Sequence, residues 1–113
     1  MTTWIVACLC AEWCGSCREY RATFDAAARA LGADARFAWI DIEERPEVMD
    51  DLDVESFPTL LLMRDDEISF YGPVMPHASA LEALVRRALE GKLGRVDDAA
   101  LAGLPARVRQ AVA

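Results

Sequence analysis

Four short apolar segments along the chain have the length and composition of β-strands. The first, Trp4 to Cys10, is a continuous apolar run with β-branched residues, which predicts a strand buried on both faces. The segments 36–42 and 58–63 are also mostly apolar, whereas 67–71 alternates apolar and polar residues. Because alternation is typical of a strand with one solvated face, we expect 67–71 near an edge of the sheet.

Helical periodicity fills the intervals between these segments. Apolar residues recur every three or four positions over 14–31, which predicts a helix with one buried face. A proline with acidic residues on both sides of it, near the positive end of a helix, predicts a short helix over about 46–53. A capping-box sequence that begins at Ser79 predicts a further helix over 79–89, closed by Gly91.

The predicted order is therefore β-α-β-α-β-β-α followed by a tail. A strand–helix–strand unit gives parallel strands through a right-handed crossover, and the last two strands are close enough for an antiparallel hairpin. We expect an α/β domain over 1–92, with a four-stranded mixed sheet and helices on both faces, and a helical extension over 93–113. The tail has an apolar stripe that favours packing on the domain, with a dimer or partner contact as the alternative: Leu101, Leu104, Val108 and Val112.

The charge and length of the chain exclude several classes of partner. Its 113 residues carry a formal net charge of −7 and no basic run, which argues against nucleic acid and anionic membranes. No apolar run approaches the ~20 residues that span a bilayer. Residues 1–6 lack the basic region and cleavage site of a signal peptide, so we expect a cytoplasmic protein. We also expect a monomer rather than a dimer.

Cysteine is confined to one short segment. The four cysteines are Cys8, Cys10, Cys14 and Cys17. A disulfide scaffold would distribute its bridges along the chain to close long loops, whereas this clustering indicates redox chemistry or metal binding.

Cys14 and Cys17 lie at the start of the first predicted helix, and residues i and i+3 project to the same side. Unpaired N–H groups at a helix N-terminus favour a thiolate on the exposed Cys14, while Cys17 is the first residue of the buried stripe. This asymmetry predicts that Cys14 attacks a substrate disulfide and that Cys17 then resolves the mixed disulfide. The alternative is a pair of cysteines that serve as small buried hydrophobic residues.

Three neighbours of the pair are candidate substrate-binding residues. The ring of Trp13 would lie beside the sulfurs and shape a docking surface. Gly15 would let a partner backbone approach closely, and Ser16 would offer its hydroxyl to a sulfur.

Residues 10–17, CAEWCGSC, followed by 56–62, SFPTLLL, closely resemble the thioredoxin family, and the resemblance covers about 3–90. It implies the thioredoxin fold and a disulfide reductase with no cofactor beyond a redox-active Cys14–Cys17 disulfide. It also implies protein disulfide substrates, an electron-donor reductase, and a role in electron transport and cell redox homeostasis. A cis peptide bond before Pro58 would place Phe57 beside the cysteines to pair with an extended substrate.

The sequence departs from the family pattern in several places. It begins at the strand that leads into the motif, so we expect a minimal form without the N-terminal strand and helix of full thioredoxins. Cys8 occupies the place of a buried aspartate that assists the second cysteine, and Trp39 that of its lysine. Glu12, water or the leaving thiolate of the substrate would then take the proton of Cys17.

Two auxiliary cysteines follow from the same departures. We expect Cys8 to pack in the core, with redox exchange with Cys17 as the alternative. Cys10 replaces a tryptophan and leaves room near the pair.

The favoured function is a thiol–disulfide oxidoreductase that acts as a reductant. Alternatives are a binding or assembly module with regulatory or vestigial cysteines, a metal site built from the four cysteines, and a thiol peroxidase or redox sensor. His77, the single histidine, is expected to be an exposed residue at the start of the last helix.

Overall fold

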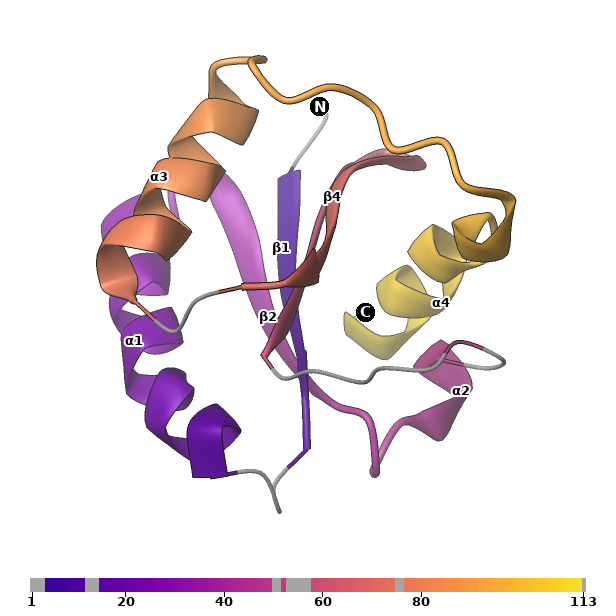
Figure 1. The fold of residues 1–113 in the computed structure, drawn as a ribbon, viewed down its shortest axis with the longest axis horizontal. Helices are drawn as coiled ribbons and strands as arrows, with labels where there is room; N and C mark the ends of the chain where they lie inside the picture. The colour runs from indigo at the N-terminus through magenta and orange to yellow at the C-terminus, as the bar shows by residue number, and fades with distance from the viewer. Residues whose placement is uncertain (1–3, 12–14, 50–51, 53–57, 75–76, 113) are drawn as a thin grey trace.

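The secondary structure follows the predicted order (Figure 1). The computed structural model describes the chain except for residues 1–3, 12–14, 50–51, 53–57, 75–76 and 113. The elements are β1 (Trp4–Cys10), α1 (Gly15–Leu31), β2 (Ala35–Asp41), α2 (Pro46–Met49), β3 (Thr59–Arg64), β4 (Glu67–Pro73), α3 (Ala78–Leu89), a 3-10 turn (Ala99–Leu101) and α4 (Leu104–Val112).

β1 lies inside a four-stranded sheet whose order is β2-β1-β3-β4. It pairs with β2 in parallel and with β3 in antiparallel, and β3 and β4 form an antiparallel hairpin. The predicted mixed sheet is confirmed. Because β1 and β3 have a partner on each side and a layer of helices on each face, both strands are almost continuously buried.

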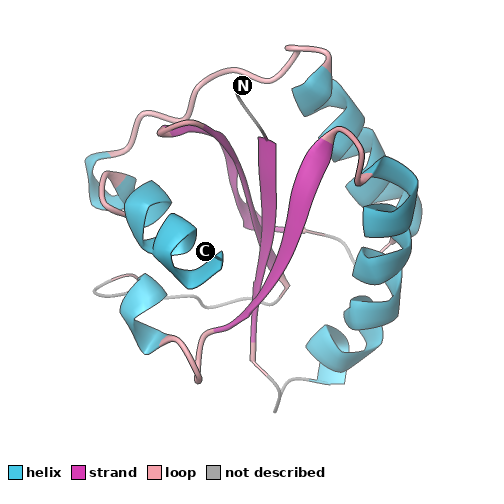
Figure 2. Cartoon of the chain, turned by 180° about the vertical axis from the view of Figure 1, so that it is seen from behind, coloured by secondary structure: helices cyan, strands magenta, loops and turns pink. Residues whose placement is uncertain are grey.

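Helices cover both faces of the sheet. α1 and α3 lie on one face and α2 and α4 on the other, as the two opposite views show (Figures 1 and 2). Alternate residues of β1 therefore enter different cores: Cys8 and Cys10 face α1, whereas Ala7 and Leu9 face α2 and α4. This alternation places two of the cysteines on the same face as the first helix.

The C-terminal tail packs on the domain, as its apolar stripe predicted. Leu104 and Val108 are fully buried in the core that contains Leu9 and Leu61 of the sheet. The Nε of Arg107 donates a hydrogen bond of 2.8 Å to the carbonyl of Val48 in α2. The division between 1–92 and 93–113 stays an interpretation of the sequence, but α4 completes the second core.

The last helix of the sheet domain begins one residue before Ser79. Its N-cap is His77, which is exposed, has an extended backbone with φ −119° and ψ 137°, and makes no cap hydrogen bond through its side chain. Ala78, directly after this extended residue, is the first residue of the helix. The predicted capping role of Ser79 is therefore wrong, while the position of His77 is as expected.

Other boundaries agree with expectation within a residue or two, except at α2. The described part of α2 ends at Met49, and most of the residues up to position 53 lie outside the described structure. Within the described part of the chain, none of the helices combines the length and apolar composition that a bilayer crossing requires.

Candidate redox site

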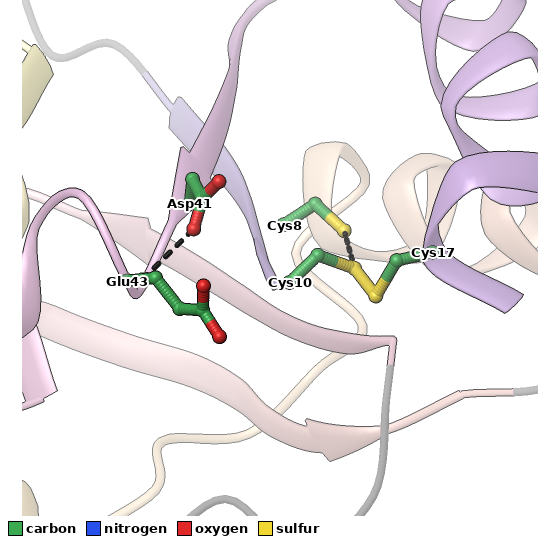
Figure 3. The surroundings of a disulfide bond; sticks show 5 residues. All are labelled: Cys8, Cys10, Cys17, Asp41 and Glu43. Atoms are coloured by element: carbon green, nitrogen blue, oxygen red, sulfur yellow. Dashed lines mark hydrogen bonds between the residues drawn. A yellow bond between two sulfur atoms is a disulfide. The ribbon is translucent and has the colours of Figure 1, made fainter. Parts of the chain in front are cut away.

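Cys10 and Cys17 are joined by a disulfide where β1 gives way to α1 (Figure 3). Cys10 is the last residue of β1, and Cys17 is the third residue of α1. Their Cα atoms are 5.8 Å apart, within the usual range for a disulfide. The sequence pattern did not predict this pairing, and it assigned Cys10 only an auxiliary position.

Several predicted site residues lie outside the described part of the chain. These are Glu12, Trp13, Cys14 and Phe57. The Cys14–Cys17 disulfide therefore stays a prediction, and the structure places only Cys17 of that pair.

The two described substrate-binding candidates on α1 are exposed to solvent. Gly15 and Ser16 open the helix, and both are exposed. Among the described residues, a Cβ added to Gly15 would meet nothing closer than a guanidinium nitrogen of Arg18, at 3.9 Å. Packing against the described residues therefore does not require glycine here, which leaves the close approach of another molecule as its predicted role.

Pro58 lies at the same end of the sheet as the disulfide. It is buried, and its carbonyl accepts a hydrogen bond of 3.2 Å from the N–H of Val74. The next residue, Thr59, begins β3 and is the register partner of Leu9, which precedes Cys10. The start of β3 and the end of β1 thus meet beside the cysteines, and the cis bond before Pro58 stays a prediction.

Cys8 lies beneath the disulfide and has a free thiol. Its Sγ is 3.5 Å from the Sγ of Cys10, and both sulfurs point toward α1 (Figure 3). Burial raises the pKa of the Cys8 thiol from 9.0 to about 12, against a smaller opposite effect of Arg21. Cys8 is therefore a neutral thiol in the core at physiological pH. The sulfur of Cys17 is bonded to Cys10 and not to Cys8.

Aromatic side chains pack in the same core as the cysteines. The rings of Phe24 and Trp39 meet edge to face at 5.7 Å, and the guanidinium of Arg21 lies 4.8 Å from the centre of the Trp39 ring. The hydroxyl of Tyr20 is buried without a hydrogen-bond partner among the described residues. Burial raises the pKa of Tyr20, and the nearby Cys8 raises it further. The interior around the sulfurs is thus apolar.

A cavity of about 190 Å³ opens beside Cys17. The described residues that line it are Ala11, Cys17, Arg18, Arg21 and Trp39. Guanidinium groups near a sulfur favour its thiolate form. Sequence reasoning missed both arginines, although their positions one and four residues after Cys17 were a signal that they flank its sulfur.

Asp41 lies beside Cys10 in the sheet and is a further residue that sequence reasoning did not single out. It is the register partner of Cys10 in β2, and its carboxylate accepts a hydrogen bond of 2.8 Å from the N–H of Glu43 (Figure 3). Its place follows from the register between β1 and β2, which the sequence does not encode locally.

Within the described ranges, His, Cys, Asp and Glu do not form a group of three or more that could hold a metal ion.

Comparison with known proteins identifies the family. A family model described as thioredoxin matches residues 2–87. The chain is 32% identical over 75 residues to a putative thioredoxin 2 of Streptomyces coelicolor, covering 66% of this chain and 55% of the relative. It is 36% identical over 59 residues to a thioredoxin of Rhodospirillum rubrum, covering 52% and 57%. The chain thus spans little more than half the length of these two relatives.

Solved structures show the same fold. The germline-specific thioredoxin Deadhead of Drosophila melanogaster superposes with a TM-score of 0.67 at 25% identity, over 75% of this chain and 80% of that one. The mitochondrial thioredoxin 3 of Saccharomyces cerevisiae gives a TM-score of 0.63 at 25% identity, over 74% and 76%. The fold is thioredoxin-like, and the chain belongs to the thioredoxin family.

Proposed function

We propose that this chain is a thiol–disulfide oxidoreductase that reduces disulfides in proteins, with Cys14 as the nucleophile and Cys17 as the resolving cysteine. The observation that carries the proposal is the position of Cys17. Its sulfur lies in the first turn of α1, three residues after Cys14, and already takes part in a disulfide with a neighbour. A cysteine so placed is sheltered from substrates and still open to a second sulfur of its own chain.

The reaction needs two exchanges. The Cys14 thiolate attacks one sulfur of the substrate, the substrate S–S bond breaks, and the other substrate sulfur leaves as a thiolate. Cys17 then loses its proton and attacks the Cys14 sulfur, which forms a Cys14–Cys17 disulfide and releases the reduced substrate. The positive end of α1 stabilises the thiolate that starts the first step.

The proton of Cys17 requires an acceptor other than Cys8. Because burial raises the pKa of Cys8 to about 12, Cys8 remains a thiol and cannot replace a carboxylate. Glu12, water or the leaving thiolate of the substrate is the acceptor. Arg18 and Arg21, which line the cavity at Cys17, favour the thiolate that results.

Substrate docking takes place where the end of β1 meets the start of β3. We assign backbone pairing with an extended substrate to Phe57 and Pro58, and further docking contacts to Trp13, Gly15 and Ser16. The burial of Pro58 and its hydrogen bond from Val74 support a fixed position for Pro58. We assign the chain to the cytoplasm, as a monomer that receives electrons from a separate reductase, because a reducing compartment keeps thiols in the dithiol form that attacks disulfides.

Trapping tests the proposal. Cys17→Ser should accumulate mixed disulfides at Cys14, whereas Cys14→Ser should accumulate none and should not reduce insulin. Both variants should also carry Cys10→Ala, because Cys10 lies within bonding distance of position 17. Capture of the same proteins by both variants, or by neither, would contradict the assignment.

A further inference from the structure

The proposed cycle leaves Cys10 unused, yet Cys10 holds the sulfur of Cys17 in this structure. Both side chains are about 1% exposed, at the end of β1 and in the first turn of α1. The cycle, in contrast, requires the same Cys17 sulfur to bond Cys14. One resolving sulfur thus has two partners.

We propose that Cys17 alternates between two disulfide partners, Cys14 and Cys10, and that this exchange switches the oxidised protein between two states. The inference rests on the proposed function, since turnover supplies the first disulfide. In one state Cys14 is oxidised and ready for reduction by the electron donor. In the other state Cys14 is a free thiol while Cys17 is held in the core.

The exchange requires no oxidant. The thiolate of Cys10 attacks the Cys17 sulfur, a Cys10–Cys17 bond forms, the Cys14–Cys17 bond breaks, and Cys14 leaves as a thiolate. The proton that Cys10 gives up passes through solvent to Cys14, so the number of disulfides and the charge are unchanged. Attack of Cys14 on Cys17 reverses the step.

The second state cannot complete the reductase cycle. The free Cys14 still attacks a substrate disulfide, but Cys17 is occupied and cannot resolve the mixed disulfide. Burial of Cys10 and Cys17 keeps bulky external thiols away from their bond. The protein in this state therefore retains a bound substrate rather than releasing it reduced.

Cys8 is not the second partner, although it lies on the same face of β1. In this structure the sulfur of Cys10 is bonded to Cys17, whereas the Sγ of Cys8 is unbonded and lies 3.5 Å from that of Cys10. Because Cys8 and Cys10 are equally buried and two residues apart, Cys8→Ala is the matched control for Cys10→Ala.

Disulfide mapping distinguishes the two pairings. The reduced chain is oxidised with a substrate disulfide, quenched in acid, alkylated, and cleaved after Glu12 and Glu19 by a glutamate-specific protease at acidic pH, where exchange is slow. A Cys10–Cys17 bond links peptides 1–12 and 13–19, and leaves Cys8 and Cys14 alkylated. A Cys14–Cys17 bond stays inside peptide 13–19.

We expect both products from the wild type and from Cys8→Ala. Cys10→Ala should give only the bond inside peptide 13–19. Cys14→Ser oxidised with diamide should still lose two thiols per chain, and it should give only linked peptides. Alkylation under native conditions should label Cys14 in the linked wild-type fraction and label no thiol in oxidised Cys10→Ala.

Absence of linked peptides from both the wild type and Cys14→Ser would overturn the inference while leaving the reductase cycle intact. A Cys8–Cys17 link in Cys14→Ser would also overturn it. Linked peptides in a chain that traps no substrate and reduces no insulin would instead refute the proposed function. The Cys10–Cys17 bond would then be a structural disulfide.

Discussion

Cys8 and Trp39 are register partners across the parallel strands β1 and β2, and both face α1. In the thioredoxin-family pattern that the sequence resembles, these positions hold an aspartate and a lysine. The chain therefore has a neutral thiol and an indole ring where a charged pair would have to be desolvated. A fully buried thiol makes the stability of the fold depend on pH in the alkaline range.

The first prediction concerns this alkaline dependence. Because the pKa of Cys8 is raised from 9.0 to about 12, the unfolded chain releases this proton above pH 9 while the folded chain keeps it. The stabilising contribution is complete below pH 9 and is lost as the pH rises toward 12. The free energy of unfolding should fall by at most about 1.4 kcal/mol per pH unit from this group.

Urea unfolding of the oxidised protein across this range measures the slope. Cys8→Ala is the control, because it removes the titrating group and leaves the tyrosines in place. Its free energy of unfolding should depend less steeply on pH than that of the wild type. Equal slopes would show that Cys8 is not held as a thiol by burial.

The second prediction concerns the hydroxyl of Tyr20, which is buried without a partner among the described residues. An unsatisfied buried hydroxyl costs about 1–3 kcal/mol, and removing it relieves that cost. Tyr20→Phe should therefore leave the free energy of unfolding unchanged or raise it by about 1 kcal/mol. Chemical denaturation measures this, and a clear loss of stability would show that the hydroxyl has a partner in solution.

Local patterns predicted the elements that local chemistry determines. β1 has the predicted bounds, Trp4–Cys10, because a strand buried on both faces leaves a continuous apolar run. α1 runs over Gly15–Leu31 as its apolar periodicity indicated. The cap of α3 was misassigned, because a capping-box sequence states which residues can cap and not where the preceding backbone is extended.

The pairing of Cys10 with Cys17 could not be predicted from the spacing of the cysteines in the sequence. A separation of seven residues that crosses from a strand into a helix says nothing about the angle at which the two elements meet. Packing of α1 on the sheet sets that angle, through contacts such as Phe24 with Trp39 on β2. Cys14 and Cys17, by contrast, are related by helix geometry that the sequence does encode.

The third prediction concerns the contribution of α4 to the fold. Leu104 is fully buried in the core between the sheet and α2, so Leu104→Ala should lower the free energy of unfolding by about 2–4 kcal/mol. Arg109 in the same helix forms an exposed ion pair of 2.8 Å with Asp66. Arg109→Ala should cost no more than about 0.5 kcal/mol. Similar losses for the two variants, measured by urea unfolding, would show that α4 does not belong to the core.

The last prediction concerns the end of α3, where Gly91 has a left-handed backbone with φ 74°. Its N–H donates to the carbonyl of Ala88 at 3.0 Å, and that of Lys92 to the carbonyl of Arg87 at 2.9 Å, which is the Schellman arrangement. A Cβ on Gly91 would meet no described residue within 4 Å, so backbone strain is what opposes a side chain there.

Gly91→Ala should therefore lower the free energy of unfolding by about 1 kcal/mol. Gly94 is the matched control: it is also open to a Cβ, and its φ is not in the left-handed region. Gly94→Ala should be neutral, or stabilising by a few tenths of a kcal/mol, because alanine restricts the unfolded chain. If thermal and urea unfolding rank the two variants in the opposite order, the left-handed turn does not end α3 in solution.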